Sequence, residues 1–217
     1  IFDGMTRMVQ SMLHRLYPLG EIPDYEPDPS RSFVEIAKSN NATPEEVLYD
    51  YMLKDEGHAM GMMPIFNYVD GNHDVIREML LHPQAVSGLS DGGAHCGMIC
   101  DASIPTFMLS HWTRDRTRGE KLPLEWIIKK QTLDTASLYG LSDRGSLKVG
   151  KRADLNVIDY EALTLHGPKM AHDLPAGGRR LLQEATGYDY TIVAGQITRD
   201  HGKDTGKRPG HLIRGAR

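Results

Sequence analysis

Between residues 62 and 139, short apolar runs alternate with segments of helical periodicity. The runs Met62–Asn67 and Ala85–Leu89 have the length and composition of buried strands. Helical spacing of apolar residues follows these runs at 72–80, 105–112 and 123–139. Strands that alternate with helices pair in parallel, because each helix returns the chain to the same end of the sheet. We therefore expect a stretch of barrel or doubly wound sheet.

The segment before residue 62 carries helical patterns without recognisable chemistry. Apolar residues at helical spacing predict a helix over 5–16, and a shorter one over 33–38. Thr43, Pro44 and Glu46 form a capping-box signature, which predicts a helix to about Lys54. These helices are interpreted as scaffold.

After Leu141 the pattern changes to short strands and turns. Strands are expected at 145–150 and 153–159, with a hairpin over 190–198 that turns at Ala194-Gly195. The charge changes at the same place, from −8 over residues 1–140 to +4 over residues 141–217. We therefore predict two domains, 1–140 and 141–217, and the second is a small β-rich unit.

Composition excludes several classes of protein. No apolar run approaches the roughly 20 residues that span a bilayer, so no membrane association is expected. Basic residues do not cluster with aromatic ones, which argues against nucleic-acid binding. The two cysteines, Cys96 and Cys100, are too few for a disulfide scaffold or a structural zinc site. We interpret them as reduced, partly buried thiols of a cytoplasmic protein.

The strongest local signal for chemistry is Gly88-Leu-Ser-Asp-Gly-Gly-Ala-His95, where Asp91 ends a short apolar run. Catalytic groups of α/β barrels project from the carboxyl ends of the strands. The two glycines after Asp91 let the chain turn sharply and let a ligand approach the backbone. A carboxylate there can bind a metal ion or accept a proton. The alternative is that Asp91 only caps the next helix.

Several short motifs of the sequence resemble those of the amidohydrolase superfamily. Its C-terminal signature is matched by Gln131-Thr132, Tyr139-Gly140-Leu141, Arg144-Gly145-Ser146-Leu147, Gly150-Lys151-Arg152-Ala153-Asp154-Leu155 and Val193-Ala194-Gly195-Gln196. Further motifs are similar to those of amidohydrolase family 3, in the branch that contains D-aminoacylases and other N-acyl-D-amino-acid deacylases. They are Tyr17-Pro18-Leu19-Gly20, Ser90-Asp91-Gly92-Gly93, Asp101-Ala102-Ser103 and His111-Trp112-Thr113-Arg114-Asp115-Arg116.

This resemblance implies a TIM-like (β/α)8 metal-dependent hydrolase barrel and a composite β-sandwich, of which the chain holds the C-terminal part. Asp91 matches the aspartate after the eighth barrel strand. In the family that residue binds or faces the zinc ion, accepts the proton of the attacking water and passes it to the leaving amine. The implied substrate is an N-acyl amino acid.

Other ligands of the family are not matched. No His-x-His pair occurs, and the chain opens with Ile1, so we expect a fragment whose remaining ligands lie upstream. A catalytic zinc ion needs about three protein ligands. We therefore expect zinc in the full-length enzyme, but no tight zinc binding and no activity in this chain alone. A half-barrel exposes strand edges and apolar faces, which predicts self-association or pairing with a missing N-terminal half.

Secondary candidates have structural alternatives. His95 could contact substrate or orient Asp91, and a plain loop histidine is equally compatible with the sequence. Arg114 and Arg116 could bind a substrate carboxylate, although a solvated charged loop is the simpler interpretation. His73 adjoins a helix and is expected at the surface. The alternative function is a non-catalytic scaffold protein of the amidohydrolase fold, against which the Ser90-Asp91-Gly92-Gly93 strand end argues.

Overall fold

The computed structural model describes residues 7, 10–88, 90 and 97–214. The chain divides into two compact units, residues 1–79 and 80–217. Each unit is described by itself. The predicted division at residue 140 stays a prediction about the domains of the protein.

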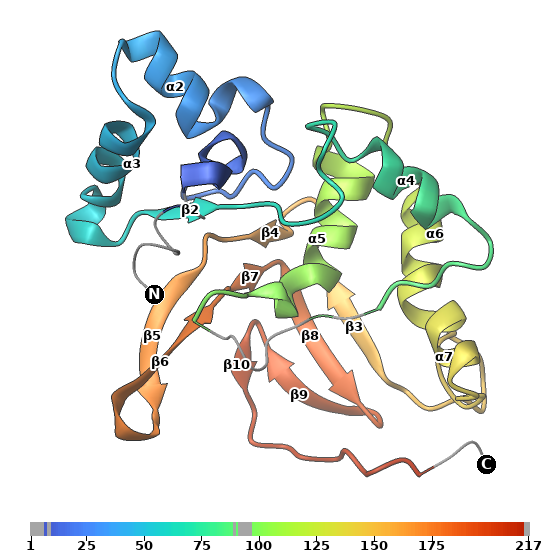
Figure 1. Ribbon diagram of the computed structural model, residues 1–217. Coiled ribbons are helices and arrows are strands. Elements are labelled where there is room, and N and C mark those ends of the chain that lie inside the picture. The colour runs from blue at the N-terminus through green and yellow to red at the C-terminus, as the bar shows by residue number, and fades with distance from the viewer. Residues whose placement is uncertain (1–6, 8–9, 89, 91–96, 215–217) are drawn as a thin grey trace. The chain divides into compact units, whose positions relative to one another are not determined.

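The first unit is a set of short helices and one small strand pair (Figure 1). Its strands are β1 (Tyr17–Leu19) and β2 (Met60–Met62), which pair antiparallel. Its helices are η1 (Leu13–Arg15), η2 (Pro29–Arg31), α2 (Phe33–Asn40), α3 (Pro44–Met52), η3 (Asp55–Gly57) and most of α4 (Asp74–Leu81). The core is formed by the buried side chains of Leu13, Tyr17, Phe33, Ala37 and Tyr68.

The predicted start of α3 is confirmed in detail. The Thr43 hydroxyl accepts a hydrogen bond from the backbone N–H of Glu46 at 3.3 Å, and the Glu46 carboxylate accepts one from the Thr43 N–H at 2.9 Å. Pro44 occupies the first turn. The Thr43 N–H bonds hold the pKa of the exposed Glu46 carboxyl below its usual value.

The predicted strand Met62–Asn67 is largely wrong. The observed strand ends at Met62, and two residues on, Pro64 has no N–H to give to a ladder. Asn67 then takes a left-handed backbone conformation, with φ of 58°. These two residues end the extended run before it can form the predicted buried strand.

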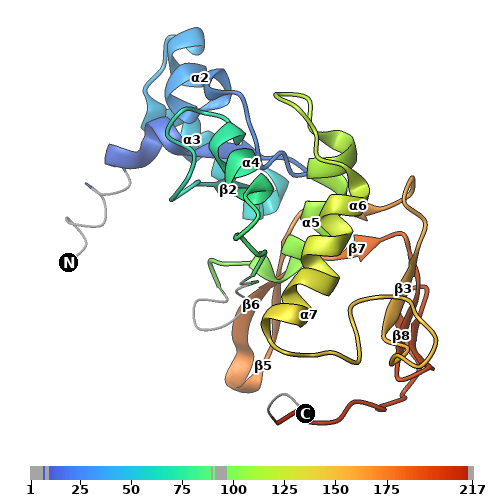
Figure 2. The ribbon, with the colours of Figure 1, turned by 90° about the vertical axis from the view of Figure 1, so that its right-hand side faces the viewer.

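The second unit combines two long helical runs with antiparallel strands. The first run comprises η4 (Asp101–Ser103), α5 (Ile104–Ser110) and the π-helical turn η5 (His111–Asp115). The second comprises α6 (Leu124–Lys129), the π-helical turn η6 (Lys130–Asp134) and α7 (Thr135–Leu138). Helices α5 and α6 pack against each other, and α6 continues into α7 (Figure 2). The helices predicted over 105–112 and 123–139 are confirmed.

The strands of the second unit form one four-stranded sheet and two strand pairs. The sheet has the order β10 (Lys203–Asp204), β9 (Gln196–Asp200), β8 (Tyr188–Val193), β3 (Leu155–Ile158). The pairs are β4 (Thr164–Leu165) with β7 (Ala185–Thr186), and β5 (Lys169–Leu174) with β6 (Gly178–Leu182), joined by η7 (Pro175–Gly177). The predicted hairpin at Ala194-Gly195 is confirmed as the β8–β9 turn.

Two strand predictions in this unit are wrong. Residues 145–150 form turns, since Gly145 and Gly150 have φ of 82° and 88°. A Cβ at Gly145 would lie 2.9 Å from the Ala136 Cβ, so only glycine allows this close approach to α7. Residues 85–88 are irregular, and side chains rather than a neighbouring strand bind their carbonyl groups.

Every strand pair among the described residues is antiparallel. These residues therefore do not themselves form the parallel sheet that the alternation of strands and helices predicts. None of the helices in the described ranges has the length and apolar character needed to cross a bilayer.

Candidate functional site

The residues with the strongest chemical signal, Asp91 and His95, lie outside the described residues, as does Cys96. The described chain leads up to them through Leu80–Gly88 and Ser90, and resumes at Gly97. The roles assigned to Asp91 and His95 stay predictions.

One helix holds the segment that leads to Asp91. The indole N–H of Trp126 in α6 donates to the carbonyl oxygen of Leu80 at 3.2 Å. One turn later the ammonium group of Lys130 donates to the carbonyl oxygen of Ala85. Residues four apart share a helix face, so both donors project on the same side. The Thr135 hydroxyl donates to Lys130 O at 2.8 Å and lies 3.4 Å from Ser87 O.

Lys130 is an unusual lysine, because only 2% of it is exposed. Its ammonium nitrogen lies 5.5 Å from the centroid of the Trp126 ring, within range of a cation–π interaction. The preceding residue, Lys129, has a side chain that is 53% exposed and forms an ion pair with Asp134 at 2.7 Å. Two adjacent lysines thus occupy different environments, and the sequence does not distinguish them.

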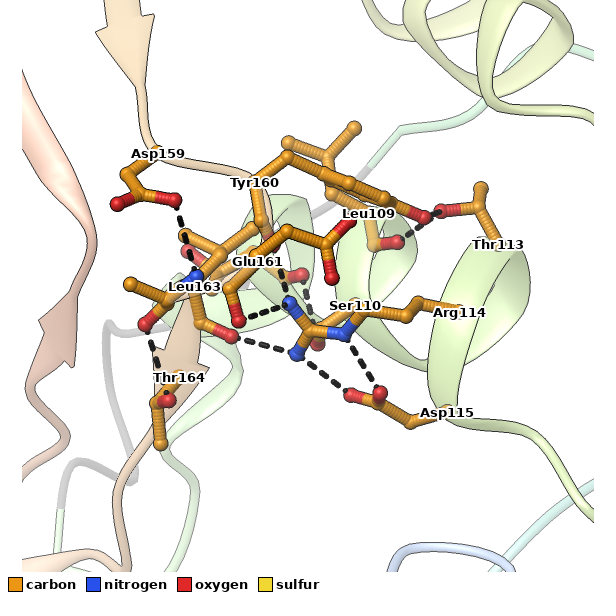
Figure 3. Close-up of polar contacts among 12 residues, drawn as sticks. Leu109, Ser110, Thr113, Arg114, Asp115, Asp159, Tyr160, Glu161, Leu163 and Thr164 are labelled. Carbon is orange, nitrogen blue, oxygen red and sulfur yellow. Dashed lines mark hydrogen bonds and ion pairs between the residues drawn. The ribbon is translucent and has the colours of Figure 1, made fainter.

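Arg114 binds the backbone that follows strand β3. Its Nε and one terminal nitrogen donate to the two carboxylate oxygens of Asp115, at 2.6 and 2.9 Å. The terminal nitrogens also donate to the carbonyl oxygens of Tyr160, Glu161 (3.2 Å) and Leu163 (2.6 Å) (Figure 3). The Asp115 hydrogen bonds are the main reason why the pKa of Arg114 is raised.

The contacts of Arg114 account for all five N–H donors of a guanidinium group. In this arrangement the side chain connects the π-helical turn η5 to residues 160–163 and has no donor left for a substrate carboxylate. The π-helical geometry places it there, with the Arg116 N–H bonded to His111 O at 2.9 Å across five residues. A substrate-binding role for Arg114 remains a prediction.

Arg116 is buried, with 1% of its surface exposed, so it is not part of a solvated charged loop. Its guanidinium group lies 4.9 Å from the Trp112 ring centroid and donates to Glu120 O at 2.8 Å. A Cβ at Gly119 would lie 2.6 Å from that guanidinium group. Arg116 therefore shapes the loop after η5, and its proposed contact with substrate is not tested by these contacts.

A row of hydroxyl groups on α5 and its flanking turns was not anticipated from the sequence. Ser103 donates to the Gln183 side chain at 2.5 Å, Thr106 lies 2.8 Å from the Tyr188 hydroxyl, and Thr113 lies 2.6 Å from the Tyr160 hydroxyl. The hydroxyl residues recur at 103, 106, 110 and 113, a helical spacing that the sequence does contain. Ser103, Thr106 and Thr113 thus connect this helical run to β8 and to loop residues of the same unit, while Ser110 bonds back to Thr106 O within the helix.

The C-terminal signature is explained by contacts of Asp154. Its carboxylate accepts hydrogen bonds from the Arg144 and Arg152 guanidinium groups at 2.9 Å and from the Ala194 N–H at 2.7 Å. Arg144 also binds Asp143, and this hydrogen bond is the main cause of the lowered pKa of Asp143. The signature thus fastens the loop after α7 to the β8–β9 turn, and its role here is structural.

Two side chains with metal-ligand chemistry lie together in the first unit. Glu26 is 2% exposed and His73 is 9% exposed, and a ligand atom of each lies within 4.8 Å of the other. The expected surface position of His73 is therefore wrong. Glu26 also accepts a hydrogen bond from the His73 backbone N–H at 2.7 Å.

Cys100 is half-buried and unbonded to other cysteines in the described part of the chain, as expected for a reduced thiol. Burial raises its pKa, and the neighbouring Asp101 adds to the effect. A thiol with a raised pKa is a weaker nucleophile at neutral pH. These surroundings do not activate Cys100 as a nucleophile.

Comparison with known proteins identifies the family. A family model described as the amidohydrolase family matches residues 48–199, which are 152 of the 217 residues. The chain belongs to the amidohydrolase family. The match runs from α3 through Asp91 to the end of β9, and so includes both helical runs of the second unit. No curated protein and no solved structure matches this amidohydrolase chain.

Family membership makes the chain a hydrolase domain of a family that typically binds metal ions. The expectation of an amidohydrolase is thereby confirmed at the level of the family.

Proposed function

We propose that this amidohydrolase chain is part of a metal-dependent enzyme that hydrolyses a non-peptide amide bond, with N-acyl-D-amino acids as substrates. The observation that carries the proposal is the family match through Ser90-Asp91-Gly92-Gly93. This choice of substrate is supported by the motifs that resemble those of N-acyl-D-amino-acid deacylases, including Asp101-Ala102-Ser103 and the segment His111–Arg116. We further propose a (β/α)8 barrel with a composite β-sandwich as the architecture of the whole enzyme.

Asp91 is proposed as the proton-transfer residue and as a carboxylate that faces the metal ion. Amide hydrolysis needs a base that takes a proton from the attacking water and an acid that protonates the leaving amine. One carboxylate can do both in turn, since the proton it accepts in the first step is the one it delivers in the second. A bound zinc ion would supply Lewis-acid activation when present.

Substrate contacts are proposed for His95, Arg114 and Arg116. A guanidinium group is suited to the carboxylate of an N-acyl amino acid, because it can form two parallel hydrogen bonds. Arg114 would have to exchange some of its five backbone and Asp115 bonds to do so. Arg116 is 1% exposed, so it too would have to leave its present contacts to reach a substrate.

The test is hydrolysis of a panel of N-acetyl-D- and N-acetyl-L-amino acids by the zinc-loaded full-length enzyme. We expect turnover of D substrates and a loss of at least about 10³-fold in kcat for Asp91→Asn, since the amide cannot carry the proton. Asp101→Asn, at an exposed position ten residues on, is the matched control and should retain activity. Turnover that survives Asp91→Asn would remove Asp91 from the reaction, and no turnover of any amide would favour the scaffold alternative.

A zinc titration of the 217-residue chain tests the metal prediction separately. The other metal ligands of the family are not matched in this chain, so we expect no stoichiometric site with a Kd below about 1 µM. Isothermal calorimetry of the wild type and of His73→Gln should give similar weak heats. A tight, stoichiometric site in the wild type would contradict this prediction.

A further inference from the structure

A groove with basic side chains lies on the four-stranded sheet of the second unit. It has a volume of about 430 Å³ and is lined by residues of β8, β9 and β10 and by the chain from Lys207 to Gly210. This volume falls within the range of pockets that take small molecules. The groove belongs to one unit, and all of its lining residues are among those that the structure describes.

The turn that leads from β10 into the groove is held by local hydrogen bonds. The N–H and the hydroxyl of Thr205 both donate to the carbonyl oxygen of Thr198 in β9, at 3.0 and 3.2 Å. The Gly206 N–H donates to the Asp204 carboxylate at 2.8 Å, and Gly206 takes the left-handed conformation with φ of 78°. The groove is therefore preorganised, which lowers the entropy cost of binding a ligand.

The lining of the groove has an excess of positive charge. Three of its side chains are cations and one is a carboxylate: Arg199, Lys207, Arg208 and Asp204. The Asp204 carboxylate accepts two hydrogen bonds from Arg208, at 2.9 and 2.6 Å. The Arg208 hydrogen bonds, with the Gly206 N–H, lower the pKa of Asp204 to about 2, so this pair stays ionised at neutral pH. A concave surface with an excess of one sign of charge concentrates ions of the opposite sign.

Arg199 and Lys207 offer two kinds of donor to an anion. The guanidinium group of Arg199 has five N–H donors, and one terminal nitrogen donates to Gly202 O at 2.8 Å. The ammonium group of Lys207 is a compact charge with three donors. A phosphate group carries nearly two negative charges and three acceptor oxygens, so it can bind both. The half-buried Val193 and Pro209 add apolar surface to the same groove.

We propose that this groove binds a small phosphomonoester. Its phosphate group contacts Arg199 and Lys207, and its organic part packs against Val193 and Pro209. Asp204 limits the affinity, because its carboxylate repels the anion while it holds Arg208. The site uses none of the residues proposed for amide hydrolysis, so the inference goes beyond the proposed function and does not depend on it.

The experiment is a titration of the 217-residue chain with phenyl phosphate and with inorganic phosphate, followed by phosphorus NMR. We expect a Kd of about 1 mM for phenyl phosphate at low salt. Inorganic phosphate should bind at least about threefold more weakly, because it lacks the ring that buries apolar surface. The Kd for phenyl phosphate should rise at least about threefold in about 0.3 M sodium chloride, since exposed charges are screened.

Substitutions in the groove should change the Kd in opposite directions. Arg199→Gln and Lys207→Gln should each raise it at least about fivefold, because each removes a charged hydrogen-bond donor. Asp204→Asn should lower it at least about threefold, since the amide removes the repulsion and its oxygen can still accept from the Gly206 N–H. The matched control is Arg180→Gln, which removes an exposed arginine of the same unit outside the groove and should leave the Kd unchanged.

A Kd in Arg199→Gln and Lys207→Gln equal to that in Arg180→Gln would overturn the proposal, because the groove would then contribute no more than net charge. If Arg199→Gln does not fold, Lys207→Gln carries the comparison, since the Lys207 side chain is exposed. Unchanged or weaker binding by Asp204→Asn would also overturn it. Equal affinities of the wild type for phenyl phosphate and inorganic phosphate would exclude a contact with the organic part.

Discussion

At the scale of single residues, the second unit uses arginine and lysine side chains as ties to backbone carbonyl groups. Arg114 binds three carbonyl oxygens after β3, Arg116 binds one in its own loop, and Lys130 binds one in the segment before Asp91. Charged donors form stronger hydrogen bonds than neutral ones, and a planar guanidinium group can hold several acceptors at once. These residues stabilise irregular segments that have no strand partners.

Arg114→Lys tests the strength of such a tie. Lysine has a single ammonium group, so it cannot reproduce the two parallel hydrogen bonds to Asp115, and at least one bond to a carbonyl oxygen is also lost. We expect the free energy of unfolding to fall by about 2 kcal/mol, after allowance for partial exposure. Urea unfolding followed by tryptophan fluorescence reports on this unit, which contains Trp112 and Trp126, the two tryptophans of the chain.

The matched control is Arg180→Lys. Arg180 binds Asp173 with two hydrogen bonds at 2.8 and 2.6 Å, but in an exposed hairpin. We expect its free energy of unfolding to change by less than about 0.5 kcal/mol. Equal stability of Arg114→Lys and the wild type would show that the Arg114 contacts do not stabilise the unit.

At the scale of elements, helix signals were read from the sequence more accurately than strand signals. The start of α3 follows from a capping box, and the helix predicted over 33–38 is observed as α2, because helix hydrogen bonds join residues that are close in the sequence. Strands at 62–67 and 85–89 were predicted from apolar runs alone. A strand also needs a partner, and neither run has one over its predicted length in the described structure.

The capping box of α3 gives a prediction at this scale. Thr43→Ala removes the acceptor for the Glu46 N–H and should destabilise α3 by about 1 kcal/mol. Amide exchange in residues 44–50 should then rise about fivefold. Ser39→Ala is the control, because the exposed Ser39 hydroxyl only bonds back to Glu35 O, and it should leave exchange in α2 nearly unchanged. Unchanged exchange in Thr43→Ala would mean that packing, not the cap, holds the helix start.

At the scale of the whole molecule, both units expose large apolar side chains. In the first unit Phe66 is 81% and Val69 is 87% exposed, and in the second Leu147 is 86% exposed and Val149 is fully exposed. Isolated exposed apolar residues are normal, but neighbouring ones mark surfaces that other molecules cover. They are consistent with the proposal that the chain associates with itself or with another part of the enzyme.

We expect the 217-residue chain to self-associate, with a mean mass above 24.2 kDa that rises with concentration in light scattering after size exclusion. The double substitution Leu147→Glu with Val149→Glu should lower that mass if the second unit carries the contact. The control is Lys148→Glu, which adds a negative charge between the two positions and leaves both apolar side chains in place. Leu163→Glu cannot serve as the control, because Leu163 is buried and does not belong to this exposed surface. A monomer at every concentration would contradict self-association.

The sequence by itself determined the family, the capped start of α3 and the β8–β9 hairpin, because these depend on local signals or on recognisable motifs, and it supplied the prediction that Asp91 transfers the proton. Only the tertiary structure decided that Lys130 is buried and Lys129 exposed, that Arg114 binds the backbone after β3, and that Glu26 meets His73 across 47 residues. The physical reason is that burial and pairing depend on which distant segments meet. Adjacent residues of the same type can therefore take opposite roles.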